Sequence, residues 1–317
     1  MEDNSKSIKE LTNLINQLTD EIHQVFDVPL DSSFRLATTI LNQPSLPNFG
    51  NIKEEENRQI HALYSELKES NYRASDMRRA YREAYLTSQR EKENYTVDIT
   101  LELPLIYLKV ISETLIKKFE IYEHKNVLNA LANDGNLSCA LAISSNINES
   151  DLYVTVKDEN ELKIAENLRD LCAFSYPIQM ELPDLSFRCD LIVSDPFLRD
   201  AEDILVFFAD YQEYLNYEGF FVCVIMTEFV RSRVFTDMLE QYGFVLLGVI
   251  EYPKDLLEGP IKSSIVILEK KDETNVEFFA TEMPSVKKIE DNIKVMNDIK
   301  KYLNDYLGGI KNENNVN

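Results

Sequence analysis

The sequence predicts an α/β fold: a doubly wound, mostly parallel sheet with an antiparallel edge hairpin, preceded by an α-helical N-terminal domain. Between residues 98 and 270, short apolar strand-like segments alternate with segments of helical period, as in parallel sheets covered by helices. The last two strand-like segments are joined by a loop too short for a helical crossover, so they should pair antiparallel. We expect a helical domain at 1–95, a sheet domain at 96–310 and a disordered tail at 311–317.

The N-terminal region has the patterns of four helices. Ser7 and Glu10 have the spacing of a capping box, and apolar residues then recur every three or four positions as far as Val25. Shorter helical patterns follow at residues 34–41, 60–67 and 77–85.

The sheet domain has seven strand-like segments. They cover residues 127–130, 152–156, 178–180, a run that ends at Ser194, 219–226, 244–251 and 263–269. The helices expected between and before them include 104–115, 137–143, 159–171 and 204–217. Both alternating sets of residues in 219–226 are apolar, which indicates a central strand covered by helices on both faces. Residues 276–280 are compatible with one more strand, and 286–306 with a charged helix.

Composition narrows the class of protein. A hydrophobic content of 44% is ordinary for a globular chain with a core. The sequence has neither a long uncharged apolar run nor the pattern of a secretory signal, so we expect a cytoplasmic protein without a membrane span. The four cysteines form no C-x-x-C pair and lie far in sequence from the three histidines, so no metal site is expected.

The first candidate site lies in the stretch Asp190–Phe197, where an expected buried strand ends and a polar turn follows. Ligands of open α/β sheets bind at the carboxyl ends of the strands, which is where Asp195, Pro196 and Phe197 should lie. The plainer alternative is that Pro196 stops the strand and Phe197 packs beneath it.

With these elements in order, the chain resembles the class I S-adenosylmethionine-dependent methyltransferases. Within them it is similar to the N6-adenine DNA methyltransferase family, close to its YtxK-like branch and to the modification subunits of type I restriction systems. The segments that carry the resemblance are Asn129-Ala-Leu-Ala-Asn-Asp-Gly-Asn-Leu137, Ser194–Phe197, and Tyr252–Leu257 with Ile265–Leu268. The resemblance implies a seven-stranded Rossmann-like methyltransferase sheet, S-adenosylmethionine as cofactor and nucleic acid as a partner.

The resemblance also implies roles for individual residues. On the substrate side it assigns Asp195, Pro196 and Phe197, because their counterparts accept hydrogen bonds from an adenine amino group and stack on the flipped base. On the cofactor side it assigns Thr100, Asn129, Asn133, Gly135 and Thr155.

Several of these positions depart from the family pattern. Asn129 stands where the family has an acid, Asn133 where it has a glycine, and Thr155 where an acid bonds the cofactor's ribose. The loop after Asp195 has one proline fewer, which should displace the Phe197 ring by roughly 3.3 Å. S-adenosylmethionine is therefore expected to bind weakly or not at all.

Three functions stay open at this point. The first is a methyltransferase-fold protein whose catalysis is weakened or lost and which serves as a binding or regulatory module, with a protein as its partner. The second is an active methyltransferase on an exocyclic amine with a remodelled cofactor loop. The third is a metabolite- or nucleotide-binding protein that shares only the architecture. The sequence leaves open whether the chain is an enzyme.

Net charge gives a prediction about DNA. The chain has 33 Lys and Arg residues against 55 Asp and Glu residues, which gives a formal net charge of −22 at pH 7. Affinity for nucleic acid rests largely on basic groups that neutralise phosphates. The basic residues that do gather are interleaved with glutamates, which indicates a solvated helix face; they are Arg73, Arg78, Arg79, Arg82, Arg90 and Lys92. We expect no strong duplex binding at physiological salt in a gel-shift assay. Tight, specific binding by the isolated protein would contradict this expectation.

Overall fold

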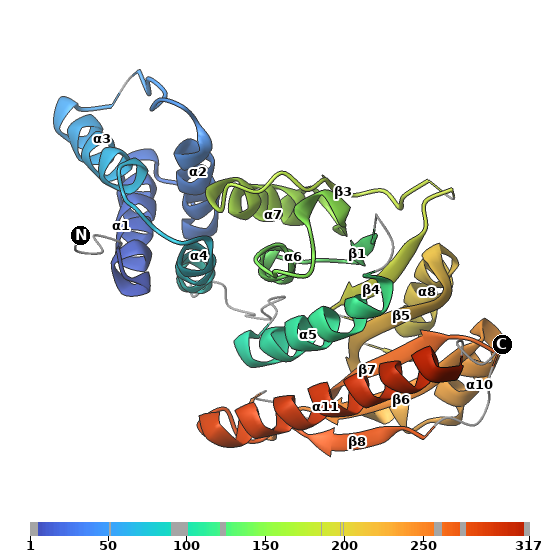
Figure 1. Cartoon of the computed structure of the whole chain (residues 1–317). Coiled ribbons are helices and arrows are strands. Elements are labelled where there is room, and N and C mark those ends of the chain that lie inside the picture. The colour runs from blue at the N-terminus through green and yellow to red at the C-terminus, as the bar shows by residue number, and fades with distance from the viewer. Residues whose placement is uncertain are drawn as a thin grey trace. The chain divides into compact units, whose positions relative to one another are not determined.

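The computed structural model describes residues 6–50, 52–89, 101–120, 125–184, 186–196, 198, 200–256, 262–272 and 277–313, and for 310–313 the backbone only. The chain forms two compact units (Figure 1). Unit 1 takes its residues from 1–99, 134–143 and 158–175, and unit 2 from 100–133, 144–157 and 176–317. The expected boundary at residue 95, between an independent helical domain and an independent sheet domain, stays a prediction.

Unit 1 is helical. Its helices are α1 (Ile8–Phe26), α2 (Leu30–Asn42), α3 (Glu54–Lys68), α4 (Ala74–Ser88), α6 (Asn136–Ala142) and α7 (Glu159–Leu171). The predicted capping box is present at α1, where the Ser7 hydroxyl accepts from the Glu10 amide and the Glu10 carboxylate accepts from the Ser7 amide. The apolar stripe of α1 is buried against α2, α3 and α4, as its period predicts.

The basic residues of α4 do not all lie on a solvated face, so that expectation is wrong for two of them. Arg78 and Arg82 are 4% and 8% exposed. The reason is that α4 packs against α6, and the Arg78 guanidinium donates to Asn136 Oδ1 at 3.2 Å. Interleaved charges in the sequence do not reveal which arginines a neighbouring helix will cover.

Unit 2 contains the sheet. Its strands are β1 (Val127–Asn129), β2 (Leu152–Thr155), β3 (Ile178–Gln179), β4 (Cys189–Ser194), β5 (Leu215–Met226), β6 (Phe244–Glu251), β7 (Ser263–Lys270) and β8 (Phe279–Glu282). Their order in the sheet is β3-β2-β1-β4-β5-β7-β6-β8. Strand β7 is antiparallel to β5 and β6, and all other pairs are parallel. The fold is therefore the predicted doubly wound, mostly parallel sheet with an antiparallel hairpin, but it has eight strands rather than seven because β8 extends the edge beside β6.

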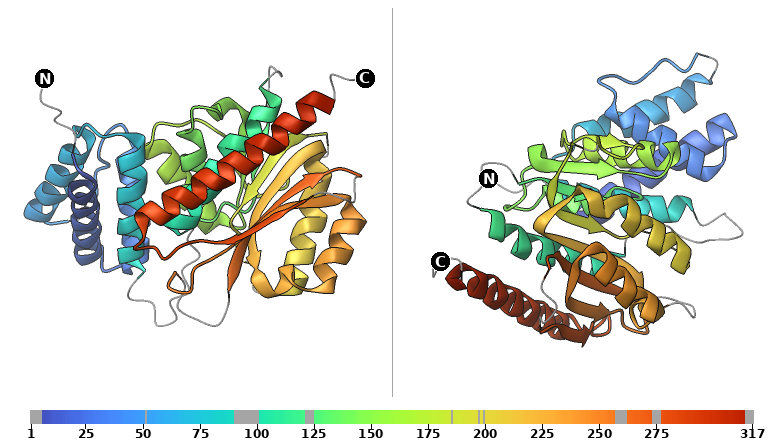
Figure 2. Two further views of the ribbon diagram at one scale, coloured as in Figure 1. Left: turned by 60° about the horizontal axis from the view of Figure 1, so that its bottom comes forward. Right: turned by 90° about the vertical axis from the view of Figure 1, so that its right-hand side faces the viewer.

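Helices cover both faces of this sheet (Figure 2). One face carries α8 (Ala201–Tyr211), α9 (Thr227–Val230) and α10 (Arg233–Tyr242), and the other carries α5 (Glu102–Leu115) and α11 (Ile289–Glu313). Helix α8 ends earlier than the expected 204–217 because the chain already joins the sheet at Leu215, which pairs with Cys189. Helix α11 continues to Glu313, into the segment predicted as a tail, and residues 314–317 lie outside the described part. Among the described residues, no helix is both long and apolar enough to cross a membrane.

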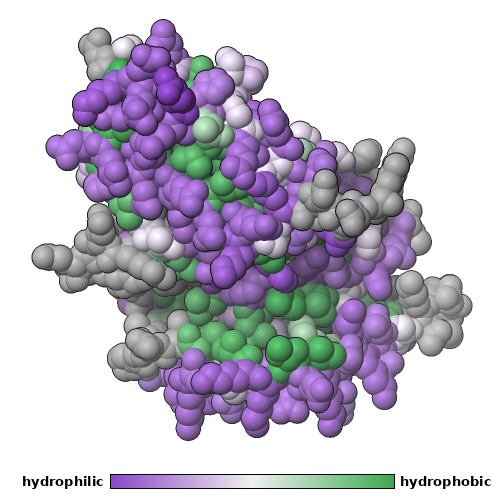
Figure 3. Space-filling view, turned by 90° about the vertical axis from the view of Figure 1, so that its left-hand side faces the viewer, coloured by the Kyte–Doolittle hydropathy of each residue, from purple (hydrophilic) through white to green (hydrophobic). Residues whose placement is uncertain are grey.

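Some apolar side chains at the start of α11 face outward. Val286 precedes the helix and is 44% exposed, and Ile289 and Ile293 are 68% and 50% exposed. Figure 3, which faces the side from which α5 and α11 start, shows apolar residues gathered into a band that hydrophilic residues border. Such a gathering is typical of an interaction surface.

Strand β5 is buried on both faces, as predicted. The Phe221 ring lies 5.0 Å from that of Phe208 and 5.9 Å from that of Phe244, measured between centroids. The adjacent residue Phe220 points to the opposite face, where its ring contacts that of Phe119 at 6.0 Å. Phe220 and Phe221 are both fully buried.

This packing predicts the effect of truncating Phe221. Phe221→Ala removes a buried ring and leaves a cavity, so the free energy of unfolding should fall by about 3–5 kcal/mol in urea denaturation. Phe278→Ala is the matched control, because Phe278 is 55% exposed, and it should change the value by less than about 1 kcal/mol. Equal losses in the two variants would mean that β5 is not the centre of the core.

Candidate functional site

The loop that follows β1 turns sharply at the carboxyl edge of the sheet. Leu131 and Asn133 both have φ of +49°, in the left-handed region that asparagine tolerates and leucine rarely adopts. Two hydrogen bonds to Thr155 hold this turn: the Leu131 amide donates to Thr155 Oγ1 at 3.1 Å and the Ala132 amide to the Thr155 carbonyl at 2.7 Å.

Thr155 therefore has a structural role in the unit. Its hydroxyl also bonds the Tyr211 hydroxyl at 2.9 Å, and the residue is 1% exposed. Burial raises the pKa of Tyr211 to about 12, so its phenol stays protonated near neutral pH. The hydroxyl that the resemblance assigns to the ribose-binding position is thus engaged with the chain itself.

Asn129 lies at the end of β1 and is fully buried. Its Nδ2 donates to the Val193 carbonyl of β4 at 2.9 Å. An aspartate at this position would lack that donor and would face the carbonyl with a charge. The asparagine therefore suits the pairing of β1 with β4.

Asn133 connects the loop after β1 to the loop after β4. Its Nδ2 donates to the backbone carbonyl of Asp195 at 2.6 Å. The next carbonyl, that of Pro196, accepts from the Leu198 amide at 3.0 Å, and Ser194 Oγ donates to the Ala130 carbonyl at 2.5 Å. Successive carbonyls of the candidate substrate loop thus already accept bonds from the chain.

Gly135 belongs to unit 1, where it begins α6 with φ of +76°. A Cβ at this position would lie 2.9 Å from the Cα and Cβ of Ala165 on α7, closer than packed atoms allow. Packing against α7, together with its positive φ, explains the glycine. A role of Gly135 in making room for a cofactor stays a prediction.

Asp134, also in unit 1, is a buried acid beside that glycine. It is 2% exposed, and its carboxylate accepts from the Asn136 amide at 3.0 Å and from Asn136 Nδ2 at 2.8 Å. Burial raises the pKa of Asp134 to about 6, although these hydrogen bonds and the charges of Arg82 and Arg78 act in the opposite direction. Sequence reasoning did not single out this residue.

Tyr252 is a second residue that sequence reasoning did not single out, except as part of a matched segment. It directly follows β6 and is 8% exposed. In the part of the chain that the structure describes, its hydroxyl is the one buried side-chain oxygen or nitrogen without a hydrogen-bond partner. Burial raises the pKa of Tyr252 well above its usual value, and the Asp195 charge adds to the shift. The signal in the sequence was a Tyr-Pro pair immediately after a buried strand.

The structure thus brings together part of the predicted site. Asn129, Asn133, Thr155 and Asp195 lie at the carboxyl ends of the adjacent strands β2, β1 and β4. Asp195 is 8% exposed and Pro196 follows it in the same loop. Phe197 and Thr100 lie outside the described residues, so the predicted displacement of the aromatic ring stays a prediction. Within the described ranges, no three His, Cys, Asp or Glu side chains gather as metal ligands would.

Comparison with known proteins relates the fold to that of methyltransferases. No family model matches the chain, and neither does any curated protein sequence. A solved structure from Listeria monocytogenes, assigned to the class I S-adenosylmethionine-dependent methyltransferases, has a TM-score of 0.77 at 15% identity, over 93% of this chain and 98% of that one. The type I restriction-modification methyltransferase subunit of Streptococcus thermophilus has a TM-score of 0.60 at 13% identity, over 95% of this chain and 76% of that one. The type IIG restriction endonuclease BpuSI has a TM-score of 0.58 at 14% identity, over 92% of this chain but only 40% of that one.

At these identities the likeness shows the fold and not the activity. The chain has the fold of class I S-adenosylmethionine-dependent methyltransferases, including subunits of type I restriction-modification systems.

The unpartnered hydroxyl of Tyr252 predicts an unusual effect on stability. Tyr252→Phe removes a buried hydroxyl that makes no internal bond, so the free energy of unfolding should stay the same or rise. The matched control is Tyr107→Phe, because the fully buried Tyr107 donates to Asn292 Oδ1 at 3.0 Å and its loss should cost about 1 kcal/mol. Urea denaturation compares the two variants. A Tyr252→Phe loss as large as the control's would mean that the hydroxyl is bonded within the unliganded protein.

Proposed function

We propose that this chain is a methyltransferase-fold protein of the N6-adenine type, in the YtxK-like branch, with weakened or lost catalysis and a binding or regulatory role. The observation that carries the proposal is the bond from Asn133 Nδ2 to the Asp195 carbonyl. At this position the resemblance implies a glycine, which would leave space beside the cofactor. Here the space holds the Asn133 side chain, and its amide end is held by the bond to Asp195.

Three further contacts support the loss of function. The Thr155 hydroxyl is engaged by Leu131 and Tyr211 and so is a poor partner for a ribose. Asn129 donates to a strand carbonyl, and its amide cannot supply the negative charge of the family's acid. These groups satisfy one another, which is the arrangement expected of a pocket that no longer needs a ligand to complete it.

One observation favours the second candidate, an active enzyme on an exocyclic amine. Tyr252 has a buried hydroxyl without a partner, and the Asp195 charge acts on it. In an active site, the Asp195 carboxylate and a backbone carbonyl would accept hydrogen bonds from the amine and stabilise the developing charge. S-adenosylmethionine would supply the methyl group.

A protein is the better-supported partner of the binding module. The exposed apolar residues at the start of α11 suit a protein surface. The net charge of −22 disfavours DNA, even though similar folds occur in restriction-modification subunits.

Calorimetric titration with S-adenosylmethionine tests the proposal. The unmodified chain should show no binding, or a dissociation constant far weaker than micromolar. Asn133→Gly should bind the cofactor measurably, because it removes the tied side chain at a position whose positive φ glycine adopts freely. The variant should remain folded, since it leaves one carbonyl without this donor at a cost of about 1–3 kcal/mol.

Asn133→Ala is the matched control for this experiment. It removes the same carboxamide but keeps a Cβ in the left-handed region, so its gain in affinity should be smaller than that of Asn133→Gly. Micromolar binding by the unmodified chain would overturn the proposal, and a folded Asn133→Gly protein without any gain would remove Asn133 as its cause.

A further inference from the structure

The first turns of α11 carry an exposed apolar stripe, formed by Ile289, Ile293 and Met296. Their spacing of four and three residues places them on one side of the helix, and Val286 lies just before its start. Ile289 is 68% exposed, more than any other large hydrophobic residue that the structure describes. A covering partner would remove these aliphatic side chains from water, which is favourable.

The opposite side of α11 is fixed within unit 2. Asn292 accepts a hydrogen bond from the Tyr107 hydroxyl at 3.0 Å, and Ile299 and Leu303 are buried. The Tyr306 hydroxyl donates to Glu269 of β7. Because these contacts set the rotation of the helix, the stripe cannot turn inward to be covered by its own sheet.

The charge around the stripe has the opposite sign to that of the whole chain. Residues 286–301 contain five lysines and three acidic residues, whereas the chain carries −22. One of these acids, Asp291, lies 3.8 Å from Lys288. Lys287 and Lys294 flank the isoleucines, and neither has a carboxylate contact among the described residues. An apolar stripe between unpaired ammonium groups suits a partner that is apolar on one side and acidic beside it.

A hollow of about 420 Å³ lies at the residues directly before the stripe. Pro253 of the loop after β6 and Met283 and Pro284 of the segment after β8 are among its lining. The Ser285 hydroxyl donates to the Asp255 carboxylate at 2.5 Å and so joins the two segments. The hollow is therefore formed before a partner arrives, and it has room for a side chain of that partner.

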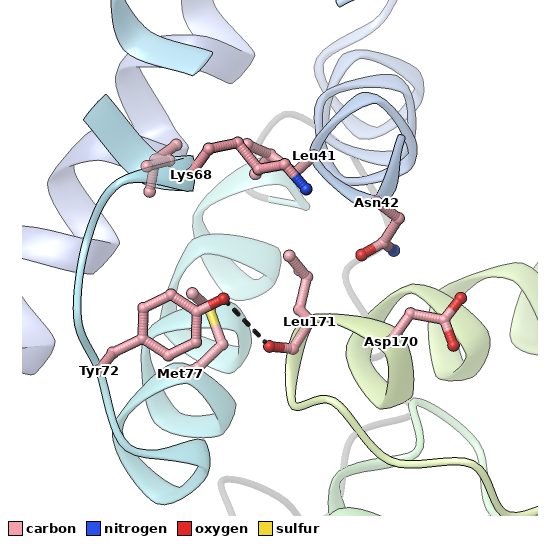
Figure 4. A pocket seen from close by; sticks show the side chains of 8 residues that line it. Leu41, Asn42, Lys68, Tyr72, Met77, Asp170 and Leu171 are labelled. Atoms are coloured by element: carbon pink, nitrogen blue, oxygen red, sulfur yellow. Dashed lines mark hydrogen bonds between the residues drawn. The ribbon is translucent and has the colours of Figure 1, made fainter. Parts of the chain in front are cut away.

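A pocket in unit 1 is a weaker candidate for a docking site. Figure 4 shows the Tyr72 hydroxyl bonded to the Leu171 carbonyl, to which it donates at 3.2 Å. Leu41 and Met77 of its lining are at most 2% exposed, so they belong to the core of the unit.

We propose that the stripe and the hollow form a docking surface for an acidic amphipathic helix of a partner protein. The partner's apolar side chains pack along Ile289, Ile293 and Met296, and its carboxylates face Lys287 and Lys294. This proposal rests on the binding role proposed above and specifies the chemistry of the partner. The stripe is short, roughly 11 Å along the helix axis, so the contact is transient rather than permanent.

Two other occupants fit this surface less well. A symmetric contact with a second copy would set the five lysines of one segment 286–301 against those of the other. An anionic membrane surface would repel a chain whose net charge is −22.

Two peptides test the proposal on the full chain by fluorescence anisotropy. Both have about 18 residues with leucines at helical spacing, and their other positions hold glutamate and glutamine in one peptide and lysine and glutamine in the other. The acidic peptide should bind roughly tenfold more tightly, and added salt should narrow this preference. Equal binding of the two, tighter binding of the basic peptide, or no binding of the acidic peptide at millimolar concentration would overturn the proposal.

Substitution of Ile293 locates the binding. Its side chain is 50% exposed in the free protein, so Ile293→Ser should keep the fold and lower the affinity for the acidic peptide by roughly three- to tenfold. Val234→Ser is the matched control, because Val234 is 45% exposed on α10, which covers the other face of the sheet, and it should leave the affinity unchanged. An unchanged affinity in Ile293→Ser, or equal losses in both variants, would overturn the proposal.

The same variant separates the other occupants. A dimer in sedimentation, or binding to phosphatidylserine vesicles, that Ile293→Ser abolishes would assign the surface to a second copy or to a membrane and would overturn the proposal. The cofactor titration described above reports on the sheet edge and the peptide titration on α11, so a failure of one proposal is distinguishable from a failure of the other.

Discussion

Strands β1 and β4 lie side by side and run parallel, and the rest of unit 2 depends on this pairing. Parallel neighbours end at the same edge, so the loops after Asn129 and Ser194 leave the sheet together. Bonds from Ser194 Oγ to the Ala130 carbonyl and from Asn133 Nδ2 to the Asp195 carbonyl then join these loops. Opening them leaves buried groups unpaired, at about 1–3 kcal/mol each. The edge that offers a ligand crevice in other α/β sheets is cross-linked by the chain itself.

Basic side chains are scarce in this acidic chain, and several of them are used inside it. Glu269 is 1% exposed, and its Oε1 contacts Lys118 at 2.9 Å. Its Oε2 contacts Lys271 at 3.4 Å and accepts a hydrogen bond from the Tyr306 hydroxyl of α11. This cluster stabilises the contact between α11 and β7. In unit 1 the basic residues Arg78 and Arg82 are likewise buried. These basic groups are therefore engaged in packing within the chain.

The sequence predicted the strands well and the contacts at the site poorly. Strand β4 ends at Ser194 as expected, because an apolar run followed by a polar turn is a local signal. The end of α8 at Tyr211 was missed because pairing with β4 draws Leu215 into the sheet, and local propensity does not contain that pairing. The partners of Thr155 were equally hidden, since Tyr211 lies 56 residues away along the chain. The isolation of the Tyr252 hydroxyl is a property of the folded environment alone.

If Asn133 holds the loops after β1 and β4 closed, its side-chain amide should report this directly. In a ¹⁵N-labelled protein, the two protons of this carboxamide can be assigned by their loss in Asn133→Gly. If the bond to the Asp195 carbonyl closes the loops, these signals should exchange slowly with water and stay unchanged as S-adenosylmethionine is added to millimolar concentration. Fast exchange in the free protein, or a shift of these signals that saturates with the cofactor, would show that the loops open and that Asn133 does not close them.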